Sequence, residues 1–195
     1  MTSAWIAVGA AIGGGLVAGL LTGFYQHWRE HWNRPILSID FQDDKFHRVE
    51  STHKRSDGKE DSFVYIRARV RNTGRNVAKD CRVFLAHLEE VHPSGKTTRT
   101  VFLDSRQLAW SGWNFVSLSL PAGLDFYADV LRISKAASGW GISVEQIFAS
   151  EQDLKSYSGT YRFHLVATSE NAVPARCTVD ITYAGDWRNL RAVAV

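Results

Sequence analysis

Two histidines and a glutamate lie near the N-terminus in a spacing that can hold a metal ion. His27, Glu30 and His31 form the pattern H-x-x-E-H. On a helix, histidines four residues apart share a face and can bind one zinc ion, with the glutamate as a general base. The motif follows directly on an apolar segment, however, and no pocket-forming helices come after it. We therefore interpret these side chains as residues of a membrane interface and assign no metal ligand here.

The other histidines are scattered along the chain, without the spacing of metal ligands. They are His47, His53, His87, His92 and His164. The sequence also lacks a phosphate-binding glycine loop, a dinucleotide fingerprint and a nucleophile elbow. We therefore predict no catalytic residue, no metal, no cofactor and no enzyme activity. An enzyme or ligand sensor whose site is built from loops, without a linear motif, stays open as the alternative.

Arginines recur on one face of a segment that alternates between apolar and polar residues. Arg67, Arg69 and Arg71 alternate with the apolar residues of 64–70. Such a stripe either pairs with acidic residues of a neighbouring strand or binds an anion or a lipid headgroup. We favour the paired, solvated face.

Three tryptophans are the candidate binding residues. Trp110, Trp113 and Trp140 lie in the glycine-containing stretches 110–113 and 138–141. Packing in the core is the default role of a tryptophan. Aromatic side chains on loops at one end of a domain can instead form a recognition surface, and this is the hypothesis for these three.

The distribution of charge divides the chain into two parts. Among its 195 residues are 23 basic and 20 acidic side chains, and none of them lies in the first 28 positions. A net charge of +3 is too even for a nucleic-acid binder. The apolar share of 45% and the charged share of 22% are typical of a globular protein and exclude a disordered one. The length accommodates one ordinary domain and an attached segment.

The N-terminal part has the properties of a membrane-spanning helix. Residues 4–25 form an uncharged run that, as a helix, would extend about 33 Å, against about 30 Å of bilayer hydrocarbon. Trp5 lies at one end and Tyr25, Trp28 and Trp32 at the other, where aromatic rings favour the headgroup level. A cleaved signal peptide would need basic residues before the apolar core and small residues at its end. Both are lacking, so we predict a retained single-pass anchor.

Small residues recur along this helix at intervals of four. They are Ala7, Ala11, Gly15, Gly19 and Gly23. Residues at this spacing share one helix face and allow two helices to pack closely in lipid. We therefore predict self-association through this face, and the alternative is a glycine-rich helix without an interface.

The basic residues and the cysteines bear on the compartment. Arg29 and Arg34 follow the apolar segment, whereas no basic side chain precedes it, and this asymmetry favours a cytoplasmic C-terminal domain. Cys81 and Cys177 lie on apolar faces of predicted strands. In an oxidising compartment they could form a disulfide, whereas a reducing cytoplasm would leave free thiols. Because the basic residues favour the cytoplasm, we predict two free thiols.

From Arg34 onward the apolar residues alternate, as in half-buried strands. The clearest segments are 37–41, 64–70, 83–88, 161–167 and 177–183, and shorter candidates are 98–103, 115–120 and 126–133. Turn signals at 72–74, 93–95 and 121–123 separate them. Seven to nine short strands without long helices predict a mainly β protein, an antiparallel sandwich or barrel.

Two local patterns sharpen this prediction. The stretch from Val70 through Asn72-Thr73-Gly74 and Ala78 to Val83 resembles bacterial immunoglobulin-like adhesion-type domains. The stretch 159–163, around Tyr161, resembles the tyrosine corner of immunoglobulin and fibronectin-type folds. Phe163 stands where an antibody domain has its second cysteine. The resemblance implies an immunoglobulin-like β-sandwich and no particular activity.

Together these observations predict a domain organisation and a role. We expect a membrane segment at 1–33, a β-sandwich at 34–187 and a C-terminal tail at 188–195. Within the sandwich, the charged segment 43–62 is expected to be a mobile loop, either disordered or a solvated hairpin. The expected role is a binding or assembly module on the membrane. Its expected partners are the lipid bilayer, a second copy of the chain and another protein, without nucleic acid.

Overall fold

The computed structural model describes residues 22–26, 28–29, 32–54, 58–102, 104–135, 140–142 and 158–195. The chain divides into two compact units, Met1–Arg34 and Pro35–Val195. The division falls one residue from the predicted boundary.

The described residues of the first unit are helical at 22–26, 28–29 and 32–33. The rings of Trp28 and Trp32 stack, with centroids 5.5 Å apart. Most of the predicted membrane segment, including Ala7, Ala11, Gly15 and Gly19 of the small-residue face, lies outside the described residues. Within the described part of the chain, none of the helices combines the length and apolar character that crossing a bilayer requires.

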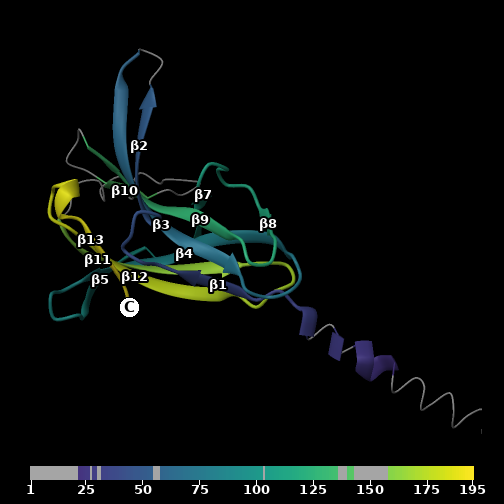
Figure 1. Ribbon diagram of the computed structural model, residues 1–195. Helices are drawn as coiled ribbons and strands as arrows, with labels where there is room; N and C mark the ends of the chain where they lie inside the picture. Colours follow the sequence, from purple (N-terminus) through teal and green to yellow (C-terminus); the bar gives the residue numbers. More distant parts are fainter. Residues whose placement is uncertain are drawn as a thin grey trace, which may run out of the picture. The chain divides into compact units, whose positions relative to one another are not determined.

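The second unit consists of two antiparallel sheets, which Figure 1 shows facing each other. In the first sheet the strand order is β1-β3-β9-β10, while β2 pairs with β3 and β7 pairs with β9. Its strands are β1 (Leu37–Asp40), β2 (Arg48–Lys54), β3 (Glu60–Asn72), β7 (Ala109–Trp110), β9 (Asp125–Ser134) and β10 (Trp140–Ile142).

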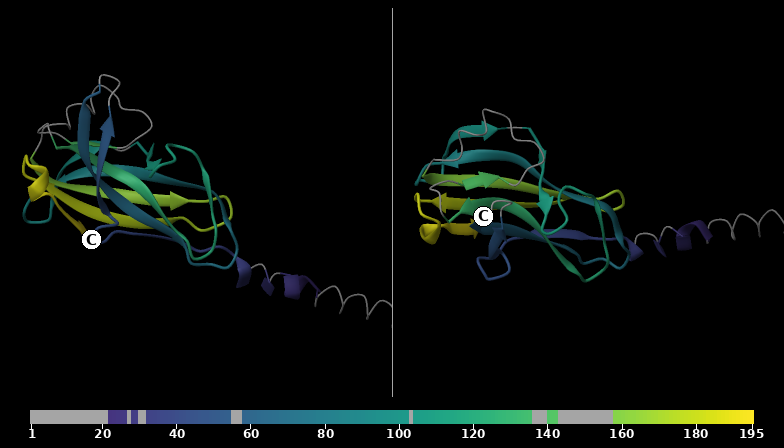
Figure 2. Two further views of the ribbon diagram at one scale, coloured as in Figure 1. Left: turned by 45° about the horizontal axis from the view of Figure 1, so that its top comes forward. Right: turned by 90° about the horizontal axis from the view of Figure 1, so that it is seen from above.

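The second sheet has the order β13-β12-β11-β4-β5, and two short strands, β6 and β8, also pair with β4. Its strands are β4 (Ala78–Val91), β5 (Thr97–Phe102), β6 (Arg106–Gln107), β8 (Leu118–Leu120), β11 (Gly159–Thr168), β12 (Ala175–Tyr183) and β13 (Arg191–Ala194). A short 3-10 helix, η2 (Trp187–Asn189), precedes β13. The two layers are also visible in Figure 2. The expectation of a mainly β, two-layer antiparallel domain is confirmed.

The core lies between the sheets and follows the alternation of the sequence. In β3, residues 64, 66, 68 and 70 are buried and alternate with half-buried polar residues. In β11, residues 161, 163, 165 and 167 are likewise buried and alternate with half-buried residues. Because successive side chains of a strand point to opposite faces, each strand contributes every second residue to the core. Both cysteines are free; Cys81 is buried and Cys177 is half-buried.

Asn72, at the end of β3, joins three parts of the domain through one buried amide. Its Oδ1 accepts hydrogen bonds from the backbone N–H groups of Ile36 and Gly74. Its Nδ2 donates to the backbone oxygens of Asn76 and Leu120, at 2.6 and 2.9 Å. The predicted turn at 72–74 is therefore tied both to the start of β1 and to β8.

Two segments outside the strands predicted from alternation also form strands. Within the predicted loop 43–62, β2 pairs with β3 in an antiparallel hairpin that extends beyond the two layers (Figure 1). Within the predicted tail 188–195, β13 pairs with β12 and buries Ala192. These two strands are held mainly by backbone hydrogen bonds to a neighbouring strand and do not need a fully apolar face. The alternation that marked the core strands was therefore weak in both segments.

Candidate functional site

The arginine stripe of β3 is paired with acidic side chains of its neighbours, as we favoured. The ion pairs are Arg67–Asp129 at 2.8 Å, Arg69–Asp40 at 2.9 Å and Arg71–Asp125 at 3.3 Å. The hydrogen bonds that Arg69 donates to Asp40 raise the pKa of Arg69. Because each guanidinium already has a carboxylate partner, this face does not offer an uncompensated site for an anion.

The three candidate tryptophans occupy different environments. Trp110 belongs to β7, which pairs with β9, and its side chain is only 2% exposed in the core. Trp113, in the following turn, is 61% exposed. Trp140 begins β10, but its side chain is outside the described part. Trp110 therefore does not contribute to a recognition surface, which corrects that prediction.

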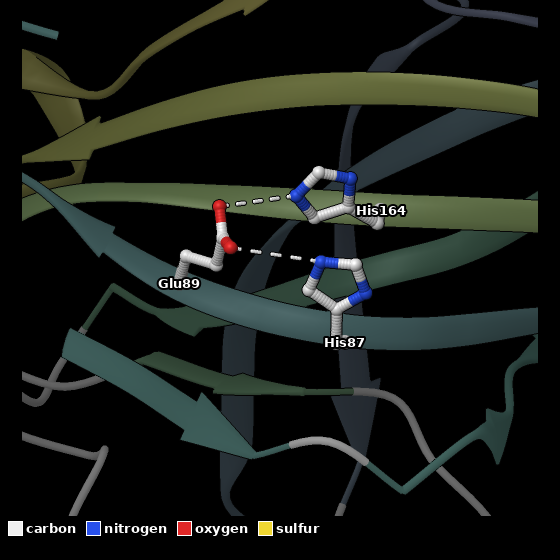
Figure 3. A group of neighbouring side chains, drawn as sticks. All are labelled: His87, Glu89 and His164. Carbon is white, nitrogen blue, oxygen red and sulfur yellow. Dashed lines mark hydrogen bonds and ion pairs between the residues drawn. The ribbon is translucent and has the colours of Figure 1, made fainter. Parts of the chain in front are cut away.

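A cluster of three metal-ligating side chains lies on the second sheet, on the face turned away from the first sheet. We call this face the outer face. His87 and Glu89 come from β4 and His164 from the neighbouring β11. Both histidines reach the same carboxylate, as Figure 3 shows. His164 Nε2 lies 3.2 Å from Glu89 Oε2, and His87 Nε2 lies 3.7 Å from Glu89 Oε1.

A β-bulge in β4 produces this arrangement. Leu85 pairs with Leu165 and His87 pairs with His164, so Ala86 is an extra residue on the β4 side. The extra residue reverses the phase of the strand. Leu85 and Leu88 both point into the core although three positions separate them. His87, which strict alternation would place inward with Leu85, points outward instead.

The bulge also explains why sequence reasoning missed the cluster. Regular alternation from Val83 and Leu85 directs His87 and Glu89 into the core, away from the expected outward position of His164. The available signal was the spacing of Leu85 and Leu88. Residues three positions apart point to opposite faces of a regular strand, so two core leucines at this spacing indicate an irregularity. The pairing of β4 with β11, some 75 residues later in the chain, has no local signature at all.

Neighbouring hydroxyl groups hold the cluster in place. Thr97 of β5 donates a hydrogen bond to Glu89 Oε2 at 3.1 Å. Thr178 of β12 places its hydroxyl 3.5 Å from His164 Nδ1. The rings of His87 and His164 are stacked, with centroids 3.8 Å apart and planes inclined by 17°. The three side chains thus have partners on four adjacent strands.

The protonation states follow from these contacts. Partial burial lowers the pKa of His87, and the nearby His164 lowers it further, which favours a neutral imidazole. Burial by itself would raise the pKa of Glu89, but the hydrogen bonds from His164 and Thr97 outweigh it and lower this pKa. At neutral pH the cluster therefore offers a neutral imidazole and an ionised carboxylate.

A second histidine site, in the first sheet, is structural. His47 is 1% exposed and packs edge-on against Phe41 and Tyr127. Its Nδ1 donates to Asp44 Oδ1 at 2.8 Å, and its backbone oxygen accepts from Arg67. It fixes the turn that leads into β2. Among the described residues, the group of three or more ligating side chains that converge is His87, Glu89 and His164.

Comparison with known proteins adds no relative to this description. The chain matches no family model, no curated protein and no solved structure. The functional conclusion therefore depends on the geometry of the outer face and on the pattern of the sequence.

Proposed function

We propose that this chain is a binding module, an immunoglobulin-like β-sandwich held at a membrane by one N-terminal helix, with its outer face as the binding surface. The observation that carries the binding role is the bulge in β4. It places His87 beside Glu89 and His164 on a surface, at the cost of regular strand pairing. Bulges are frequent beside functional sites because they redirect a side chain.

The strand order supports the immunoglobulin-like part of the proposal. The neighbours β1-β3-β9-β7 correspond to the order A-B-E-D of such domains, and β4-β11-β12 correspond to C-F-G. The strand β5, beside β4, then takes the place of C′. Tyr161 lies near the start of β11, the strand that corresponds to F, where a tyrosine corner is expected.

The membrane location is supported by the surface at one end of the domain, the end at which its chain begins. Here Thr73 donates a backbone hydrogen bond to Ile36, and Gly123 donates one to Asn72. Asn171 donates from its side chain to the backbone oxygen of Val77. The turn after β3 and the loops before β9 and β12 therefore gather around the start of β1. We call this the N-proximal end.

The N-proximal end presents apolar side chains to the surroundings. They are Ile36, Val77, Leu124 and Val173, with exposed fractions of 50%, 44%, 53% and 71%. Only about ten residues separate Ile36 from the uncharged segment 4–25, and even fully extended they span about 35 Å. Contact of this end with a lipid surface would remove these apolar side chains from water. We also propose that the domain faces the cytoplasm. The N-terminal helix in this proposal self-associates through its small-residue face.

The alternative role, a ligand sensor or an enzyme, would draw on the same cluster. A histidine bonded to a carboxylate is a common acid–base pair. A protein partner and a small ligand would both occupy the outer face. One experiment can therefore test whether the outer face is a binding surface.

The test is position-specific photo-crosslinking in the native membrane. A photoreactive amino acid replaces Arg176, which lies on the outer face of β12, or Arg132, an exposed residue of the first sheet used as the control. We expect a discrete crosslinked product from position 176 and none from position 132. Equal products from both positions, or a product from position 132 alone, would contradict the outer face as the binding surface.

A further inference from the structure

We propose that Nε2 of His87, Nε2 of His164 and a carboxylate oxygen of Glu89 bind one divalent transition-metal ion, for which Zn²⁺ is the best fit. The inference rests on the proposed role of the outer face as a binding surface and names a ligand for it. The sequence offered no such site, since these residues come from two strands that pair only in the folded domain.

The spacing of the donor atoms matches a tetrahedral zinc ion. Zinc binds nitrogen and carboxylate oxygen at about 2.0–2.2 Å, so two ligands of a tetrahedral site lie about 3.3–3.5 Å apart. Glu89 Oε2 lies 3.2 Å from His164 Nε2, and the other carboxylate oxygen, Oε1, lies 3.7 Å from His87 Nε2, so the two distances lie on either side of this value. All three donor atoms lie within 4.8 Å of one another. The stacked rings of His87 and His164 would have to turn so that both Nε2 atoms face the ion.

The donor types select the class of metal. Two imidazole nitrogens and one carboxylate are a set that zinc and neighbouring transition metals prefer. Calcium needs six to eight oxygen ligands, and magnesium needs oxygen ligands in near-octahedral geometry. Glu89 supplies the only carboxylate that contacts either histidine of the cluster among the hydrogen bonds and ion pairs of the described residues.

The surroundings leave Glu89 available to an ion. Arg162 is the residue of β11 that pairs with Glu89 across the strands. Its guanidinium is engaged by Asp180, with two hydrogen bonds at 2.7 and 2.8 Å. The guanidinium of Arg162 therefore has its own carboxylate partner, and Glu89 contacts the histidines.

The site is supported from outside its three ligands. Thr178 lies next to Nδ1 of His164, which leaves Nε2 of the same ring for the ion. Thr97 holds one oxygen of Glu89. Partners of this kind fix the orientation of metal ligands. The side chains of the three ligands remain 20–33% exposed, so a fourth position is open to water or to a donor atom of a binding partner.

The test is a titration of the full chain in detergent, without a polyhistidine tag, with Zn²⁺ by calorimetry and with Co²⁺ by visible absorption. We expect one Zn²⁺ per chain and the strong absorption bands of tetrahedral Co²⁺. Glu89→Gln and His164→Gln should each weaken Zn²⁺ binding at least about tenfold, because losing even an outer partner of a ligand costs about 10–100-fold.

Two controls make the result specific. The double variant His27→Gln/His31→Gln removes the H-x-x-E-H motif, and His92→Gln removes a histidine outside the cluster; both should bind Zn²⁺ as the unchanged chain does. Circular dichroism verifies that each variant is folded. His87→Gln, at the most exposed of the three ligands, serves as a further variant if one of the others unfolds.

Two outcomes would overturn the metal site. One is the absence of Zn²⁺ binding to the unchanged, folded chain, and the other is binding that persists in the cluster variants but is lost with His27 and His31. Neither outcome affects the crosslinking experiment, which needs no metal. A failed metal site and a failed binding surface are therefore distinguishable.

Discussion

At the scale of single residues, Asp44 shows how one carboxylate fixes a turn. Its Oδ1 accepts hydrogen bonds from the side chain of His47 and from the backbone N–H groups of Phe46 and His47. The bond from the His47 side chain is the main reason that the pKa of Asp44 falls from 3.8 to about 2. A carboxyl group with a depressed pKa in the folded state stabilises that state above its unfolded pKa.

This linkage gives a pH dependence with a definite sign. The contribution of Asp44 is complete above about pH 4 and is lost as the pH falls toward 2. In Asp44→Asn, we expect lower stability than the unchanged protein at pH 6 and a smaller difference between the two at pH 2. The measurement is urea unfolding of both proteins at pH 6, 4, 3 and 2. A stability difference that stays constant over this range would show that the ionised carboxylate plays no part.

At the scale of the elements, the buried amide of Asn72 connects β1, the turn after β3, and β8. Asn72→Ala removes four hydrogen bonds and leaves polar backbone groups of Ile36, Gly74 and Leu120 without that partner. Because a buried polar group without a partner costs about 1–3 kcal/mol, we expect a loss of about 2–4 kcal/mol in the free energy of unfolding.

The measurement for this variant is urea unfolding of residues 34–195, which have their own core. Asn76→Ala is the matched control, since Asn76 contributes only its backbone oxygen to the amide and its side chain is exposed. The control should stay within about 0.5 kcal/mol of the unchanged domain. Equal losses in the two variants would mean that the turn, rather than the buried amide, holds these elements.

The elements also show what the sequence could and could not predict. Alternation located β3, β11 and β12 because their apolar residues must face a core. It missed β2 and β13, where pairing with a neighbour matters more than an apolar face. It could not give the outward position of His87, because the bulge in β4 changes the phase of the strand without leaving a turn residue. The cluster with His164 depends on pairing between distant strands, which no local pattern encodes.

At the scale of the whole molecule, the uncharged segment and the sandwich have separate roles in the proposal. A fragment of residues 34–195 should be soluble and show a β-rich circular dichroism spectrum, since the strands and the core of the described residues belong to the second unit. The full chain should stay in the membrane pellet after extraction at alkaline pH, and the fragment should not. A full chain released by this extraction would contradict an integral anchor.

The apolar side chains of the N-proximal end allow a sharper test of how the domain meets the membrane. In vesicles containing the full chain, a photoreactive amino acid at Leu124 or Val173 should label lipid, because burial of these exposed side chains in the bilayer interface removes apolar surface from water. The control is Ser94, an exposed residue in the turn that follows β4. Val77 of the N-proximal end precedes the same strand, so Ser94 lies at the opposite end of β4. Position 94 should not label lipid. Labelling of positions 94, 124 and 173 to the same extent would mean that the domain moves freely about its anchor, and labelling of none would place the N-proximal end away from the bilayer.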